Sequence, residues 1–188
     1  MKNLIIAAFL LFSISVNAQE FNGVPIDGDL PTFVAKMKAK GYSLRKYIDN
    51  GVIMEGKVGY QQVEVFVFTT PKSKKVFRLS VYFPKKTTWY SLKSSYNDLL
   101  SALTEKYGEP ETSYSSFSDP YFEGDGYEMS AVSLEKVNYY SAWLNKLNGN
   151  LSISLEISKY NQVNVMYDNE INVKLRDKEL NKIQNSIL

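Results

Sequence analysis

The sequence predicts an α+β fold: an antiparallel sheet of about seven to eight strands, arranged in meanders and packed by two to three helices. Strand patterns come in consecutive blocks instead of alternating with helices, which favours antiparallel pairing. Short polar connections separate neighbouring strands, as they do in hairpins. A helix followed by several strands occurs twice, which suggests a diverged internal duplication with halves 20–86 and 87–188, although the residues themselves show no repeat.

The N-terminal residues have the pattern of a secretory signal peptide. Lys2 precedes an apolar run from Leu4 to Val16, and the small residue Ala18 suits a cleavage site. The run is about 13 residues long, shorter than the ~20 that a membrane-crossing helix needs, although a retained signal anchor is the alternative. We therefore expect residues 1–18 to be cleaved and residues 20–188 to form a single α+β domain. The mature protein is expected to be periplasmic or secreted, with no membrane span after cleavage.

The first helix is predicted within residues 28–41. Asp29 suits its N-cap, Pro31 its first turn and Gly41 the residue that follows its end. Apolar residues recur at helical spacing, which predicts one buried face. They are Leu30, Phe33, Val34 and Met37.

Three strands are predicted next, over residues 51–58, 60–69 and 76–83. The second carries valines on one side and Phe66 and Phe68 on the other, so we expect a central strand with both faces covered. In the third strand, Phe77, Leu79 and Val81 are expected to share one face.

A long helix is predicted from the N-cap Thr88 to Gly108, and Pro110 prevents its continuation. Its apolar stripe is expected to belong to the core. The stripe consists of Trp89, Leu92, Tyr96, Leu99, Leu100, Leu103 and Tyr107.

A second block of strands is predicted over residues 112–118, 127–136, 138–145, 151–158 and 163–167. The strand 151–158 alternates strictly between apolar and polar residues, and an Asn-Gly turn within 147–150 is expected to precede it. A side-chain cap at 167–169 is predicted to begin a last helix over 171–188. That helix is expected to dock through Leu180, Ile183 and Ile187.

Composition excludes several classes of function. The chain has no His and no Cys, which removes Ser-His-Asp and Cys-His catalysis as well as zinc held by His or Cys. The formal net charge of +2 and the lack of long runs of like charge disfavour nucleic-acid binding. We therefore expect a protein that is not an enzyme and that needs no cofactor.

Three motifs carry a resemblance to a known group of proteins. They are the segment 23–28 (GVPIDG), which leads into a helix, the segment 106–110 (KYGEP), which ends the long helix, and the late segment 167–172 (YDNEIN). With these motifs the chain resembles small exported α+β proteins of gut-type Gram-negative bacteria. The helix-plus-meander halves are similar to the repeats of β-lactamase inhibitor protein and of the outer-membrane assembly factor BamE. The resemblance implies a fold and an export route, and it implies no catalytic residues.

The stretch DPYFEGDGYE, residues 119–128, is unusually rich in acids, aromatics and glycines. An EF-hand is excluded because its third position would be Tyr121. An irregular cation site remains an alternative, as does a pair of carboxylates for glycoside hydrolysis. The ligands of the cation site would be Asp119, Glu123, Asp125 and Glu128. The preferred interpretation is a hairpin turn at Asp125-Gly126 with a strand on each side.

Aromatic residues near this stretch are candidates for a binding surface, because Tyr and Trp dominate hot spots and stack on flat ligands. They are Tyr121, Phe122, Tyr127, Tyr140 and Trp143. We therefore expect a non-enzymatic, exported binding protein, most simply a protein-interaction module whose partner is an envelope or extracellular protein. The alternative is a small-ligand or glycan binder that uses the aromatic surface. A hydrolase that uses carboxylates alone ranks third.

Overall fold

The computed structural model describes residues 20–186, so the predicted signal peptide and Ile187 lie outside the described residues. The short strands β1 (Glu20–Phe21) and β2 (Val24–Pro25) form a two-stranded sheet. The main sheet contains β3 (Ser43–Ile48), β4 (Gly51–Val58), β5 (Gln61–Thr69), β6 (Val76–Tyr82), β7 (Thr112–Phe117), β8 (Val137–Asn145), β9 (Leu151–Ser158) and β10 (Gln162–Asn169). The helices are α1 (Leu30–Ala39), α2 (Trp89–Tyr107), α3 (Glu128–Ser133), α4 (Lys146–Gly149) and α5 (Glu170–Asn185).

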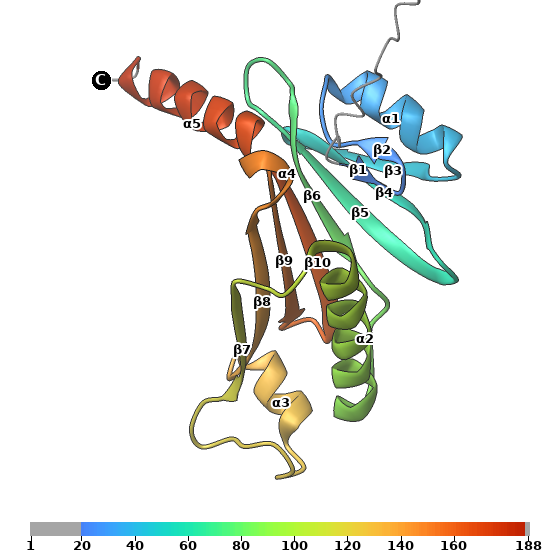
Figure 1. Cartoon of the computed structure of the whole chain (residues 1–188), viewed down its shortest axis with the longest axis vertical. Coiled ribbons are helices and arrows are strands. Elements are labelled where there is room, and N and C mark those ends of the chain that lie inside the picture. The colour runs from blue at the N-terminus through green and yellow to red at the C-terminus, as the bar shows by residue number, and fades with distance from the viewer. Residues whose placement is uncertain (1–19, 187–188) are drawn as a thin grey trace, which may run out of the picture.

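The predicted α+β class is confirmed. The main sheet has eight strands in the order β3-β4-β5-β6-β10-β9-β8-β7. Every neighbouring pair in it is antiparallel. Figure 1 shows this sheet as a strongly twisted layer, with α1 and α2 beside it. Among residues 20–186, no helix is long and apolar enough to cross a membrane.

The two halves of the chain have the same element order. In each, a helix precedes a four-stranded meander: α1 precedes β3 to β6, and α2 precedes β7 to β10. The last strands of the two meanders, β6 and β10, pair with each other and make the sheet continuous. This pairing explains how two meanders produce one sheet; the common origin of the halves stays a prediction.

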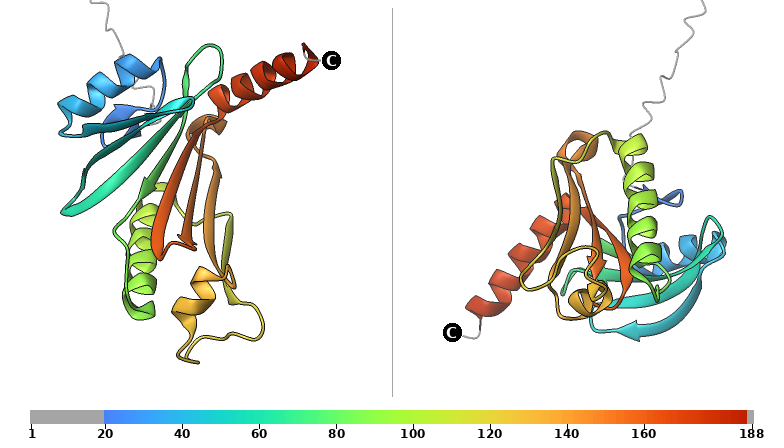
Figure 2. Two further views of the ribbon diagram at one scale, coloured as in Figure 1. Left: turned by 180° about the vertical axis from the view of Figure 1, so that it is seen from behind. Right: turned by 90° about the horizontal axis from the view of Figure 1, so that it is seen from below.

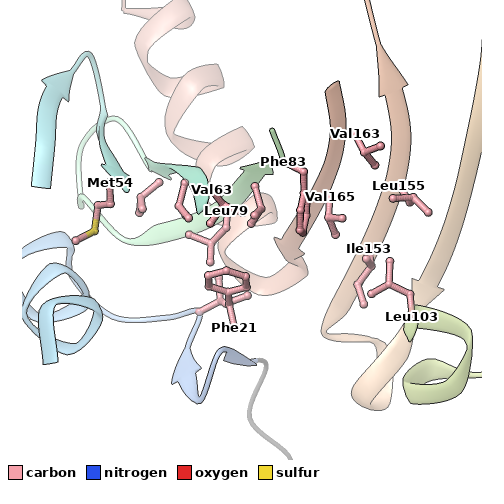
Figure 3. Packing of buried hydrophobic residues seen from close by; sticks show 14 of the residues in the cluster. Phe21, Met54, Val63, Leu79, Phe83, Leu103, Ile153, Leu155, Val163 and Val165 are labelled. Carbon is pink, nitrogen blue, oxygen red and sulfur yellow. The ribbon is translucent and has the colours of Figure 1, made fainter. Parts of the chain in front are cut away.

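The core lies on one face of the sheet, under the helices. On that face the cross-strand neighbours Val65, Val81, Val165 and Leu155 form a row across four strands, and each is at most 2% exposed. In Figure 3, Leu103 of α2 lies near Ile153 and Leu155. The buried α1 residues Phe33, Val34 and Met37 belong to the same cluster. We call this the core face, and the opposite side of the sheet the open face.

The predicted helix caps are confirmed. The side chain of Asp29 accepts a hydrogen bond from the backbone N–H of Thr32 at 3.0 Å, and Thr88 accepts one from Ser91 at 3.3 Å. Asn169 accepts one from the backbone N–H of Asn172 at 3.0 Å, so the predicted cap before the last helix is also present. Each bond satisfies an N–H that the first turn of a helix leaves without a partner.

Two predicted elements differ from the structure, and one strand was not predicted. Residues 127–136 were expected to form a strand, but α3 occupies residues 128–133 and buries Ala131 and Val132. An apolar run this short does not distinguish a helix from a strand. The turn 147–150 contains the one-turn helix α4, which joins β8 to β9. Strand β3 was not predicted because its pattern is mostly polar: it is an edge strand that carries a bulge between Leu44 and Lys46.

The docking of α5 also differs from the prediction. Leu180 is 46% exposed and Ile183 is half-buried, whereas Glu179 is 8% exposed. Figure 2 shows α5 running outward from one end of the sheet, away from α2. A helix that projects in this way is attached by its polar contacts near the sheet, so an apolar stripe is a poor guide to its packing.

Candidate binding surface

The acidic stretch 119–128 is a loop that leads into α3, and the predicted hairpin is therefore wrong. The carboxylate of Asp125 accepts hydrogen bonds from the backbone N–H groups of Phe122, at 3.1 Å, and Tyr127, at 2.7 Å. Glu128 accepts one from Gly124 at 2.8 Å. Both glycines of the loop have positive φ values, 92° at Gly124 and 80° at Gly126. These two acids therefore stabilise the loop's own backbone.

Glu123 attaches the loop to the body of the protein. Its Oε1 accepts hydrogen bonds from the Trp89 indole at 3.0 Å and from Lys93 Nζ at 2.5 Å, both on α2. Its Oε2 accepts one from the Tyr139 hydroxyl on β8 at 3.2 Å. The hydrogen bond from Lys93, followed by that from Trp89, lowers the pKa of Glu123 below its ordinary value. Glu123 thus has a structural role that its place in an acid-rich stretch did not reveal.

The cation site that was kept as an alternative for this stretch does not form among the described residues. Within residues 20–186, no three acidic side chains lie close enough together to hold a metal ion. Glu123, Asp125 and Glu128 each bind protein donors at different places, and Asp119 has no part in their contacts. The cluster seen in the sequence is therefore dispersed by the conformation of the loop.

The predicted aromatic surface is divided between three environments. Trp143 is fully buried on the core face, where its indole N–H donates to the Gly108 carbonyl at 2.7 Å. Phe122 and Tyr127 are 63% and 65% exposed on the loop, and Tyr121 beside them is half-buried. Tyr140 alone lies on the open face of the sheet. Trp143 therefore does not belong to any surface. The three loop aromatics and Tyr140 lie in different places, so the five candidates do not form the single surface that was predicted.

The open face carries a different set of side chains, all but one of them at least partly exposed. One row of cross-strand neighbours on this face crosses all eight strands of the sheet. In order it contains Ser43, Glu55, Glu64, Tyr82, Asn164, Glu156, Tyr140 and Tyr114. We call it the Tyr/Glu row. It combines carboxylates with tyrosines whose rings are large, rigid and amphipathic.

A second aromatic group lies next to the row. The ring of Phe66 packs edge-on against Tyr82, with centroids 5.2 Å apart, and stacks with Phe68 at 6.4 Å. Phe68 in turn contacts Phe77, over which the Arg176 guanidinium lies 4.9 Å from the ring centroid. Phe66 and Phe68 remain half-exposed, so the expectation that both faces of β5 are covered is wrong, whereas its expected position inside the sheet, between β4 and β6, is confirmed.

A hollow of about 340 Å³ lies beside the Tyr82 to Tyr140 part of the Tyr/Glu row, next to α3 and the β9–β10 turn. Tyr82, Tyr140 and Glu156 line it from the sheet, and Tyr160 lines it from the turn. Burial raises the pKa of Tyr82, and the nearby Glu156 and Tyr160 raise it further, so this phenol stays neutral at physiological pH. The hollow therefore combines several tyrosine rings with two carboxylates, Glu135 and Glu156.

Sequence reasoning identified Tyr140 but missed Tyr82, Glu156 and Tyr160. The alternation in residues 151–158 does place Glu156 on the outward face, and a search for acids opposite tyrosines on that face could have found the Glu156–Tyr140 pair. Tyr82 could not be found in this way, because it reaches the site through the β6–β10 pairing between the two halves. No protein-family model, no curated protein and no solved structure matches the chain.

Proposed function

We propose that this chain is an exported binding protein without chemistry of its own, and that the open face of its sheet docks a partner protein of the cell envelope or the extracellular space. The single observation that carries the proposal is the Tyr/Glu row, which continues across all eight strands. Tyrosines in a partly solvated row are typical of interface hot spots, because they lose little conformational entropy on binding.

The charge of the row supports a partner with basic side chains at its contact surface. Three carboxylates lie in the row, at Glu55, Glu64 and Glu156. Arg45 pairs with Glu64, whereas Glu55 and Glu156 accept hydrogen bonds from the neutral side chains of Ser43 and Asn164, so these two carboxylates are the ones available to a partner's cations. Opposite charges on the two surfaces would speed association and exclude acidic partners.

The proposal is tested by capture from envelope extract followed by reconstitution with the purified partner. We expect one stoichiometric partner to bind the mature chain, and binding to be lost in the double variant Tyr114→Ala/Tyr140→Ala. The matched control is Tyr47→Ala/Tyr60→Ala, which removes two exposed tyrosines that do not belong to the row. Equal capture by the row variant and the control would show that the open face is not the docking surface.

The alternative, a small-ligand or glycan binder, is favoured by the hollow beside the row. Its tyrosine rings could stack against a sugar or another flat group. A gain in melting temperature with an oligosaccharide, abolished by Tyr140→Ala, would support this function. Trp143→Ala is unsuitable for the same test, because the indole is part of the core.

A further inference from the structure

Two carboxylates, Glu135 and Glu156, and the hydroxyl of Ser158 line the hollow, whereas Asn164, the cross-strand neighbour of Glu156, is buried and does not belong to the lining. Glu156 accepts a hydrogen bond from the Asn164 amide N–H at 3.1 Å, which orients the amide. The Asn164 carbonyl oxygen then has no partner within the described residues, although the residue is only 2% exposed. Ser158 lines the hollow, and its buried hydroxyl also has no hydrogen-bond partner among the described residues. An acceptor-rich site of this kind favours a ligand that brings hydrogen-bond donors.

The charge of Glu156 is not neutralised by the protein's own cations. In the part of the chain that the structure describes, no Lys or Arg lies within ion-pair distance of Glu156. The nearest basic residue in the lining, Lys159, pairs with Glu135 at 3.1 Å and lies 5.8 Å from the Tyr160 ring centroid. An ammonium group thus already lies over one of the aromatic rings, while the carboxylate beside the other two lacks a counter-ion.

We propose that this hollow binds a primary alkylammonium group, with Glu156 as its counter-ion, Ser158 as an acceptor for its N–H groups, and Tyr82, Tyr140 and Tyr160 as its aromatic walls. Tyrosine rings attract cations through their negative faces, and the attraction increases when the cation loses water in a hollow. The ammonium can belong to a lysine side chain of a protein or to a free amine. The inference rests on the proposed binding role of the open face, but it concerns one part of that face only.

The experiment titrates the mature, isotope-labelled protein with n-butylammonium and follows the side-chain amide resonance of Asn164. We expect a saturable shift with n-butylammonium and none with the neutral n-butanol at the same concentrations. Glu156→Gln keeps an acceptor for the Asn164 amide, so it should fold, and its affinity for n-butylammonium is expected to fall about tenfold. The matched control is Glu55→Gln, a change in the same row but far along it, which should leave the affinity unchanged.

Two further probes distinguish the sources of the ammonium group. Tighter binding of a lysine with both backbone ends capped indicates a protein side chain, and tighter binding of cadaverine indicates a free diamine. Equal shifts with n-butanol, or full affinity in Glu156→Gln, would overturn the inference. Capture of a partner that is insensitive to Glu156→Gln, together with no ammonium binding, would overturn this inference alone and leave the proposed docking function standing. Ammonium binding without any captured partner would uphold the inference and favour the small-ligand function instead.

Discussion

Trp143 illustrates how burial changes the meaning of an aromatic residue. Its side chain is fully buried and its indole N–H donates to Gly108 beyond the end of α2. We expect Trp143→Ala to lower the free energy of unfolding by about 3 to 5 kcal/mol, since it leaves a large cavity in the core. Trp143→Phe should cost less, because it removes mainly one hydrogen bond. Urea unfolding checks both values, and a cost below about 1 kcal/mol for Trp143→Ala would contradict the core assignment.

Glu123 gives a second prediction, which concerns pH. Because its pKa in the folded protein is lowered, its contribution to stability is complete above the ordinary value of 4.5 and is lost as the pH falls through the folded pKa. In the Trp143→Phe background, Trp89 is the remaining tryptophan and reports directly on its bond to Glu123. We expect its fluorescence to change on acidification with a midpoint below 4.5. Adding Glu123→Gln should remove this change, and an unaltered transition in that variant would refute the assignment.

At the residue scale, the sequence indicates which side chains lie on the same face of a strand, but not which of the two faces the helices cover. Tyr139, Tyr140 and Trp143 lie on one strand, yet Tyr139 and Trp143 point to the core face and Tyr140 to the open face. Alternation predicts that division. It does not predict which face the helices cover, and the binding surface was therefore assigned to residues from both sides.

At the scale of elements, strong periodicity was reliable and weak periodicity was not. The strands 51–58, 60–69 and 151–158 and the long helix were predictable because their apolar spacing extends over many residues and their caps are explicit. Helix α3 and strand β3 were not, since one is short and the other is a polar edge strand. Their structures are decided by contacts with distant segments, which no local pattern contains.

The anchoring of α5 leads to a third prediction. The Glu179 carboxylate accepts hydrogen bonds from the backbone N–H groups of Lys72, at 2.7 Å, and Ser73, at 3.2 Å, in the β5–β6 turn. It also accepts one from the Ser73 hydroxyl at 2.5 Å. We expect Glu179→Ala to release the distal part of α5, so that hydrogen exchange and proteolysis there increase while the strands keep their protection. Lys182→Ala, an exposed change on the same helix, is the control, and equal effects of the two variants would contradict this role for Glu179.

At the scale of the whole molecule, the joint between β6 and β10 decides the architecture. The sequence predicts two meanders but not which of their edges meet, because that pairing joins segments about 90 residues apart. The joint contains the Val81–Val165 contact of the core face and the Arg78–Asp168 pair of the open face, whose two hydrogen bonds measure 2.5 and 2.6 Å. It also brings Tyr82 next to β10, where this residue lines the hollow together with Glu156 and Tyr140.

Because the core continues across this joint, we expect the two halves to unfold together. Phe21, in the first half, packs against Tyr167 of β10 at 5.7 Å, and the Ile26 carbonyl accepts a hydrogen bond from Asn169 at 2.7 Å, so neither half is complete alone. Native-state hydrogen exchange should give one opening free energy for the amides of β4 and β5 and for those of β8 and β9. Asp168→Ala should lower that shared value by about 1 to 3 kcal/mol, because it leaves the half-buried Arg78 without its bidentate partner. Exchange of one half at a lower denaturant concentration than the other would show instead that the halves are separate folding units that merely share a sheet edge.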